Sequence, residues 1–172
     1  MDKNIHARDA QLRAISIYAR RPDQAQVMHC GIAEIRNGLT CTYEQDGHRV
    51  TIDMPTAIGG DNQGPSPGYF GRAAICGCLA IGIKMMATRE DLRIDKVQVE
   101  LEQNWDNRGV LAVDGASPTP LATRITIAIS SPEQRDRVND LIVRALTRDP
   151  WFLAFRDAQP VTMKVSINEA LE

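Results

Sequence analysis

The chain has 172 residues, of which 43% are hydrophobic and 24% charged, with a formal net charge of -2 at pH 7. These values are typical of a soluble globular domain with one sizeable core, and they exclude an electrostatic case for nucleic acid or membrane partners. The N-terminus lacks a signal-peptide core, and the longest apolar run, 73–87, is shorter than the ~20 residues of a membrane-spanning helix. We therefore expect a cytoplasmic protein with reduced thiols.

A helical extension is predicted at the N-terminus. The composition of residues 6–21 is helical, and Pro22 ends the helix. Its apolar stripe consists of Leu12, Ile15, Tyr18 and Ala19. Residues 1–24 are therefore expected to form an N-terminal helical extension, and residues 25–170 the main domain.

A three-stranded meander with two hairpin turns is predicted next. The predicted strands span residues 27–35, 39–44 and 50–54. In the second and third of these, apolar and polar residues alternate, as in a half-buried strand. Asn37–Gly38 is the strongest signal for a two-residue type I′ turn, and Asp46–Gly47 predicts the second turn. The alternation places Asp53 on the polar face of the last strand.

A long apolar helix is predicted at the centre of the chain. The loop over 59–67 is rich in glycine and proline, and Ser66 with Pro67 forms a helix start, with serine at the N-cap. The helix, roughly Pro67 to Arg89, is apolar nearly all round, so it should be buried on all sides. Because this chain has few other elements to cover it, we expect a second subunit to do so, in an intimate homodimer.

Strands and helices alternate in the second half of the chain. Strands are predicted over residues 97–102, 125–129 and 161–167. The sequence Ser131–Gln134 is a capping box that begins a helix to about Thr147, and a short aromatic segment follows Pro150. The sequence therefore predicts one α+β domain, with antiparallel sheets packed on a long buried central helix.

The two cysteines of the central helix are candidate reactive groups. Cys76 and Cys78 stand two residues apart, so they point about 200° apart on a helix and can neither share a metal ion nor form a disulfide with each other. No second pair of ligands at a matching spacing exists, so no metal or cofactor is expected. Arg72 lies four residues before Cys76 and is placed to stabilise a thiolate there. Ordinary core packing is an equally good interpretation of both thiols.

The loop and central helix resemble the OsmC/Ohr family of osmotically induced and organic-hydroperoxide-resistance proteins. The resemblance rests on the run Gly59–Gly68, on residues 72–81, and on a cysteine eleven residues after the helix-starting proline, here Cys78 after Pro67. The later elements follow in the matching order, so the resemblance covers about 27–167. It implies an OsmC-like fold, an intertwined homodimer with active sites at the subunit interface, and Cys78 as the thiol that attacks a peroxide to give a sulfenic acid.

Several functional residues of that family are replaced in this sequence. In the family a second cysteine resolves the sulfenic acid to a disulfide, which a dithiol reductant reopens. The resemblance puts Asp149 at that position and Gly68 or Tyr69 at the position of a family glutamate, and only Arg49 lies near the place of its arginine. Without these groups little lowers the pKa of Cys78, and the Asp149 carboxylate would raise it on approach.

Three functions stay open. In the first, Cys78, or Cys76 as second choice, reduces organic hydroperoxides with an external thiol reductant. In the second, the dimer binds a small hydrophobic ligand at the subunit interface without catalysis, and in the third both thiols are core residues without chemistry. The residues expected to bind a peroxide or ligand are Arg72, Asp149, Trp151 and Tyr69. Further side chains suited to an apolar pocket are Phe70, Phe152, Phe155, Met85 and Met86.

Overall fold

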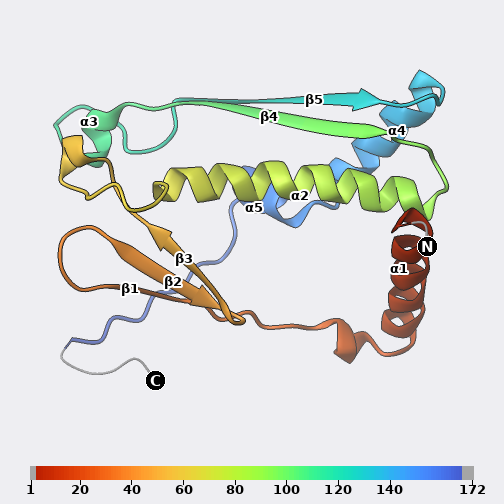
Figure 1. The fold of residues 1–172 in the computed structure, drawn as a ribbon, viewed down its shortest axis with the longest axis horizontal. Coiled ribbons are helices and arrows are strands. Elements are labelled where there is room, and N and C mark those ends of the chain that lie inside the picture. The colour runs from red at the N-terminus through yellow and green to blue at the C-terminus, as the bar shows by residue number, and fades with distance from the viewer. Residues whose placement is uncertain (1–2, 168–172) are drawn as a thin grey trace.

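Two antiparallel sheets lie on opposite sides of one long helix in the computed structural model, which describes residues 3–167 (Figure 1). The helices are α1 (Lys3–Arg20), α2 (Pro67–Arg89), α3 (Asn107–Val110), α4 (Arg135–Leu146) and α5 (Pro150–Arg156). The strands are β1 (Ile32–Ile35), β2 (Cys41–Gln45), β3 (His48–Ile52), β4 (Lys96–Asn104) and β5 (Ala122–Ser130). The predicted α+β class with a central helix is confirmed. The start of the predicted N-terminal extension, residues 1–2, and the end of the predicted main domain, residues 168–170, lie outside the described residues.

The core forms where α2 meets the β4–β5 hairpin and α4. Apolar side chains alternate along both strands, and the register pairs Val97 with Ile129 and Val99 with Ile127, so one face of the hairpin is apolar. The buried residues of this core are Ile83, Met86, Ala87, Leu92, Ile94, Val138, Leu141 and Ala145. The amphipathic α4 contributes every third or fourth residue to it, as expected for a surface helix.

The outer side of α2 is uncovered in the single chain. Its buried residues, which include Leu79 and Ile83, lie on one side, whereas Ile81 is 61% exposed and Tyr69 and Met85 are also exposed. The expected burial on all sides is therefore not reached within one chain. Length and composition alone would let α2 cross a membrane, but β4, α4, α5 and α1 all pack against it, as they would against the core helix of a soluble protein.

One of the two predicted hairpin turns of the first sheet is confirmed, and the other is wrong. Asp46 and Gly47 have φ of 50° and 76°, and the Gln45–His48 pair closes a two-residue loop, which is the type I′ arrangement. At the other hairpin only Gly38 has a positive φ, and the loop runs from Ile35 to Cys41. The type I′ turn expected at Asn37–Gly38 is therefore wrong, because the strand pairing ends before it.

Two strand predictions also need correction. The first strand begins at Ile32 and not at residue 27; the preceding Gly31 leaves space that the Tyr43 ring fills, since a Cβ there would lie 2.1 Å from its hydroxyl oxygen. The last predicted strand, 161–167, is extended chain without strand pairing, and Met163 is 90% exposed. A strand needs a hydrogen-bonded neighbour, and within residues 3–167 this segment pairs with neither the β1–β2–β3 sheet nor the β4–β5 hairpin.

The expected capping box at Ser131–Gln134 does not begin a helix. The Ser131 hydroxyl donates to the Arg93 carbonyl at 2.6 Å, and the Glu133 carboxylate accepts from the Arg93 amide at 3.0 Å. These side chains therefore tie the turn before β4 to the turn after β5. The helix begins only at Arg135, with Gln134 as its N-cap.

Asp53 is a buried organiser of the loop that leads into α2. Its carboxylate accepts hydrogen bonds from the amides of Met54, Asp61 and Gln63 and from the Thr40 hydroxyl. The amide of Gln63 above all holds the pKa of Asp53 below its ordinary value, although burial opposes this. The prediction that Asp53 lies on a polar strand face is wrong, because β3 ends one residue earlier and the chain turns inward.

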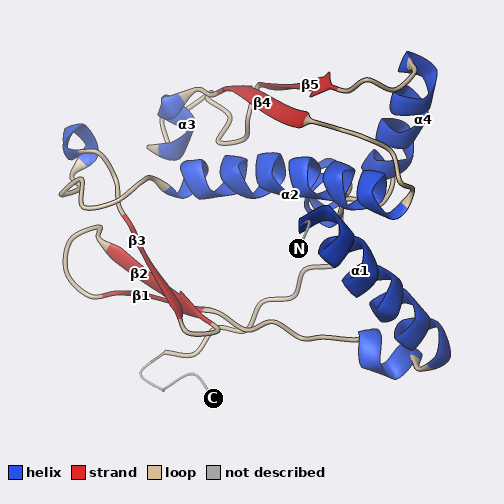
Figure 2. Cartoon of the chain, turned by 45° about the vertical axis from the view of Figure 1, so that its right-hand side comes forward, coloured by secondary structure: helices blue, strands red, loops and turns tan. Residues whose placement is uncertain are grey.

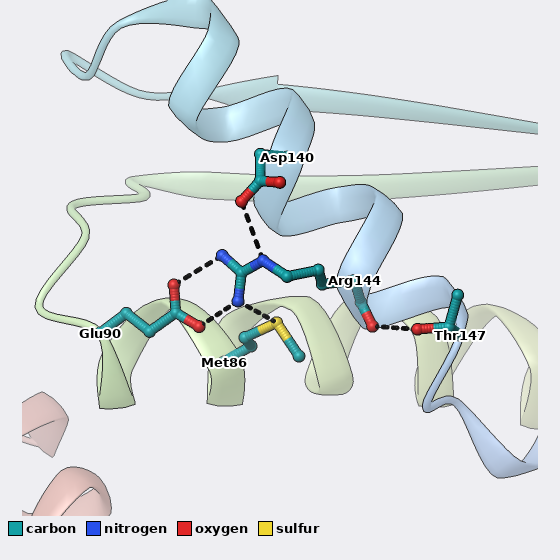
Figure 3. A network of polar contacts seen from close by, with 5 residues as sticks. All are labelled: Met86, Glu90, Asp140, Arg144 and Thr147. Carbon is teal, nitrogen blue, oxygen red and sulfur yellow. Dashed lines mark hydrogen bonds and ion pairs between the residues drawn. The ribbon is translucent and has the colours of Figure 1, made fainter.

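An arginine network joins the end of α2 to α4 (Figure 3). Arg144 Nη2 lies 2.8 Å from Glu90 Oε2, and its Nε lies 2.8 Å from Asp140 Oδ2. The sulfur of Met86 is 3.7 Å from Nη1 of the same guanidinium. The bidentate pair with Glu90 links α4 to the residue that follows α2.

Candidate functional site

Cys78 lies where the middle of α2 meets the start of α5. Figure 1 shows α5 beside α2, and the two helices are in contact. In the turned view of Figure 2, the two sheets again lie on opposite sides of α2. Gly82, one turn after Cys78, allows the approach, because a Cβ there would lie 3.3 Å from Asp149 Oδ2. Asp149 is the N-cap of α5, and its Oδ1 accepts from the Phe152 amide at 2.8 Å. The structure thus brings the predicted residues Cys78 and Asp149 together.

The surroundings of Cys78 favour its protonated form. Burial contributes most to a raised pKa of the Cys78 thiol, and the Asp149 carboxylate raises it further, while the Trp151 amide lowers it. Asp149 is only 3% exposed, and its Oδ2 has no hydrogen-bond partner among the described residues. The sequence-based expectation that Asp149 would raise this pKa agrees with this geometry.

Cys76 has a simpler environment on the other side of α2. Burial alone raises its pKa, with no contribution from Arg72. The Arg72 guanidinium instead lies back toward the start of α2, over Gly68. The four cysteines are all free thiols.

An apolar cleft of about 610 Å³ opens beside this junction. Its walls come from the first half of α2, from the end of β4 and the turn after it, and from α5. The side chains that shape it are Phe70, Arg72, Gln103, Trp105, Trp151 and Phe155. Neither Cys76 nor Cys78 is among the described residues that line it, but Trp151 belongs both to the wall and, through its amide, to the Cys78 environment.

The other residues proposed from the sequence do not all line the cleft. Tyr69 is not among the described residues that line the cleft, and it packs edge-to-face on Phe70, with ring centroids 5.4 Å apart. Arg49 lies on β3 and pairs with Glu44 on β2 at 3.2 Å. Among the aromatic and methionine candidates, Phe70 and Phe155 line the cleft, whereas Met86 is in the core.

Trp105 is a cleft residue that the sequence analysis missed. It follows β4 directly and donates to the Gln103 side chain at 3.2 Å. A tryptophan shortly after a strand of alternating apolar and polar residues could have indicated a binding site at the end of that strand, because large aromatic rings are uncommon on free surfaces.

Comparison with known proteins identifies the family. The OsmC-like protein family model matches residues 60–164, which is more than half of the chain, so this protein belongs to the OsmC-like family. The match includes α2, the β4–β5 hairpin, α4 and α5, but not α1 or the first sheet. A search of curated proteins found no match.

Solved structures share the fold at low sequence identity. An OsmC-like protein from Mycoplasma pneumoniae is 16% identical with a TM-score of 0.63, over 76% of this chain and 89% of that one. The organic hydroperoxide resistance protein OsmC from Legionella pneumophila is 18% identical with a TM-score of 0.52, over 76% and 92%. The organic hydroperoxide resistance protein OhrB of Bacillus subtilis is 18% identical with a TM-score of 0.50, over 76% and 91%. At these identities the likeness establishes the fold alone.

Proposed function

We propose that this protein is a thiol-dependent reductase of organic hydroperoxides that uses Cys78 as its single reacting cysteine. The observation that carries the proposal is that Cys78, a partly buried thiol, lies beside the buried Asp149 carboxylate, which can take up the thiol proton as the sulfur attacks. Two of the similar structures are named as organic hydroperoxide resistance proteins, which supports the same reaction class. We expect the protein to act in the cytoplasm, where thiol reductants are abundant.

The reaction can be written with Asp149 as a proton relay. The Cys78 sulfur attacks the terminal peroxide oxygen, the O–O bond breaks, and the thiol proton passes through Asp149 to the leaving alkoxide, so that the products are a sulfenic acid and an alcohol. One external thiol then displaces water from the sulfenic acid to form a mixed disulfide. A second external thiol releases Cys78 and leaves with the first as a disulfide.

The test is consumption of cumene hydroperoxide with dithiothreitol as reductant. We expect the Cys78→Ser variant to lose turnover and the matched Cys76→Ser variant to keep it. Because the pKa of Cys78 is raised, its thiolate is scarce at neutral pH, and the rate should climb as the pH rises toward that pKa. Absence of turnover, or turnover that survives Cys78→Ser, would refute the proposal.

We further propose that the active form is a homodimer. Three apolar surfaces of the single chain support this: the outer side of α2, the β1–β2–β3 sheet, and the extended segment 161–167. The sheet packs mainly within itself, with Ile32 and Ile35 exposed. In the segment, the alternating residues Val161, Met163, Val165 and Ile167 are all exposed. Surfaces of this extent are normally buried by a partner.

Ligand binding without catalysis is the second candidate function. The observation in its favour is the aromatic cleft, whose described lining includes neither thiol. Native mass spectrometry of the purified protein would show a bound small molecule whose loss follows substitution of the cleft residues. A protein that is always free of ligand, and whose melting temperature no hydrophobic compound raises, would exclude this function.

A further inference from the structure

The cleft combines apolar walls with one unpaired positive charge. We propose that it binds a monoanionic amphiphile, with the acid head group paired to the Arg72 guanidinium and the apolar body against the aromatic walls. This inference rests on ligand binding in the cleft, the second function above, and not on turnover at Cys78.

Arg72 has no partner for its charge among the described residues. It is partly buried, and within residues 3–167 no carboxylate lies within ion-pair distance of it. It stands in the second turn of α2, and the first turn carries no acidic residue. A bound anion would offset the lost hydration of the partly buried guanidinium.

The Arg72 head group lies over Gly68, and both residues line the cleft. A Cβ on Gly68 would lie 3.0 Å from Arg72 Nη1, so glycine leaves room for the guanidinium there. The planar donor fork therefore lies at the end of the cleft formed by the start of α2. This geometry suits a carboxylate, which can accept two parallel hydrogen bonds from arginine.

The walls of the cleft suit an apolar body. Trp105, Trp151 and Phe155 all line it, and each keeps a substantial exposed fraction, between 40% and 58%. Aromatic side chains that converge on a concave surface are typical of small-molecule sites, and the volume of about 610 Å³ is in the usual range. Arg72 is the one charged residue among the described lining residues, and a single cation matches a single negative charge.

The two tryptophans of the chain make the test direct, because both line the cleft. The full-length protein is titrated with decanoate, decanol and decyltrimethylammonium, and intrinsic fluorescence is followed, with calorimetry as a second readout. We expect decanoate to bind roughly 10- to 100-fold more tightly than decanol, as for one hydrogen-bonded ion pair, and the cation to bind most weakly.

Variants identify the residue responsible. Arg72→Met should abolish the preference for decanoate while decanol still binds, and Arg72→Lys should restore part of it. The matched control is Arg13→Met, which removes an exposed arginine on α1 and should change nothing. The Cys78→Ser protein should bind as the wild type does, which separates this test from that of the peroxidase.

Three results would overturn the inference. Equal affinity for acid and alcohol would leave a ligand cleft without anion selectivity. A preference for decanoate that persists in Arg72→Met would place the anion elsewhere. A lack of response to all three compounds would mean that the cleft is filled by another part of the assembly, such as a second copy of the chain.

Discussion

At single residues, the chemistry of the site is set by Asp149 acting on Cys78. A carboxylate that is buried and has one oxygen without a partner makes ionisation of the neighbouring thiol costly. The same carboxylate is also the N-cap of α5, through its bond with the Phe152 amide. Its structural and electrostatic roles can be separated, because asparagine keeps the acceptor oxygen and removes the charge.

The Asp149→Asn variant should therefore make Cys78 more reactive. Loss of the negative charge lowers the pKa of the thiol toward its ordinary value, so alkylation by iodoacetamide at pH 8 should be several-fold faster. The measurement uses a Cys76→Ser background and tandem mass spectrometry to follow Cys78 alone. Asp149→Ala is the comparison that also removes the cap. An unchanged alkylation rate in Asp149→Asn would show that the carboxylate does not act on the thiol.

Among secondary-structure elements, the contact of α2 with α4 carries the core. Leu141 is fully buried there, whereas the nearby Arg144 network lies at the half-exposed edge of the same contact (Figure 3). Truncation of a buried leucine leaves a cavity, but half-exposed ion pairs are screened by water. The packing of Leu141 should therefore contribute more to the free energy of unfolding than the ion pairs of Arg144.

Two substitutions test this ranking by urea unfolding. Leu141→Ala should lower the free energy of unfolding by about 3 kcal/mol, and Arg144→Met by clearly less. Hydrogen bonding to Arg144 holds the pKa of Glu90 below 4.5, so the ion pair stabilises the protein above that pH and its contribution is lost as the pH falls through the lowered pKa. The effect of Arg144→Met should thus vanish in acid. If Arg144→Met lowered the free energy of unfolding as much as Leu141→Ala does, the ranking would be contradicted.

For the whole molecule, the uncovered outer side of α2 decides between a monomer and a dimer. We expect a native mass of twice 19.0 kDa. Ile81 on α2 and Val143 on α4 are each 61% exposed in the single chain, so a charge at either should be equally harmless to a monomer. If α2 is shared between subunits, Ile81→Asp should shift the protein to monomer or unfold it, while Val143→Asp leaves the mass unchanged. Light scattering after gel filtration measures this, and a monomeric wild type would refute the dimer.

Local patterns determined much of the fold. The alternation along β4 and β5, the Ser66–Pro67 start of α2 and the proline after α1 predicted these elements, because side-chain period and capping are properties of neighbouring residues. The cysteine eleven residues after Pro67 also identified the family that the comparison then confirmed. The same local signals failed at Asn37–Gly38 and Ser131–Gln134, where longer-range pairing had the larger effect.

The site depended on contacts that no local pattern contains. The sequence by itself identified Cys78 as a thiol on an apolar helix. It also put Asp149, the residue before Pro150, at the position of the family's second cysteine. Only the tertiary structure decided that Asp149 lies against Cys78, that Asp53 turns inward, and that Arg72 stands at an aromatic cleft without an ion-pair partner in the described part of the chain. The physical reason is that hydrogen bonds, burial and charge act through space between distant segments, whereas sequence periodicity reports only which face of its own element a residue occupies.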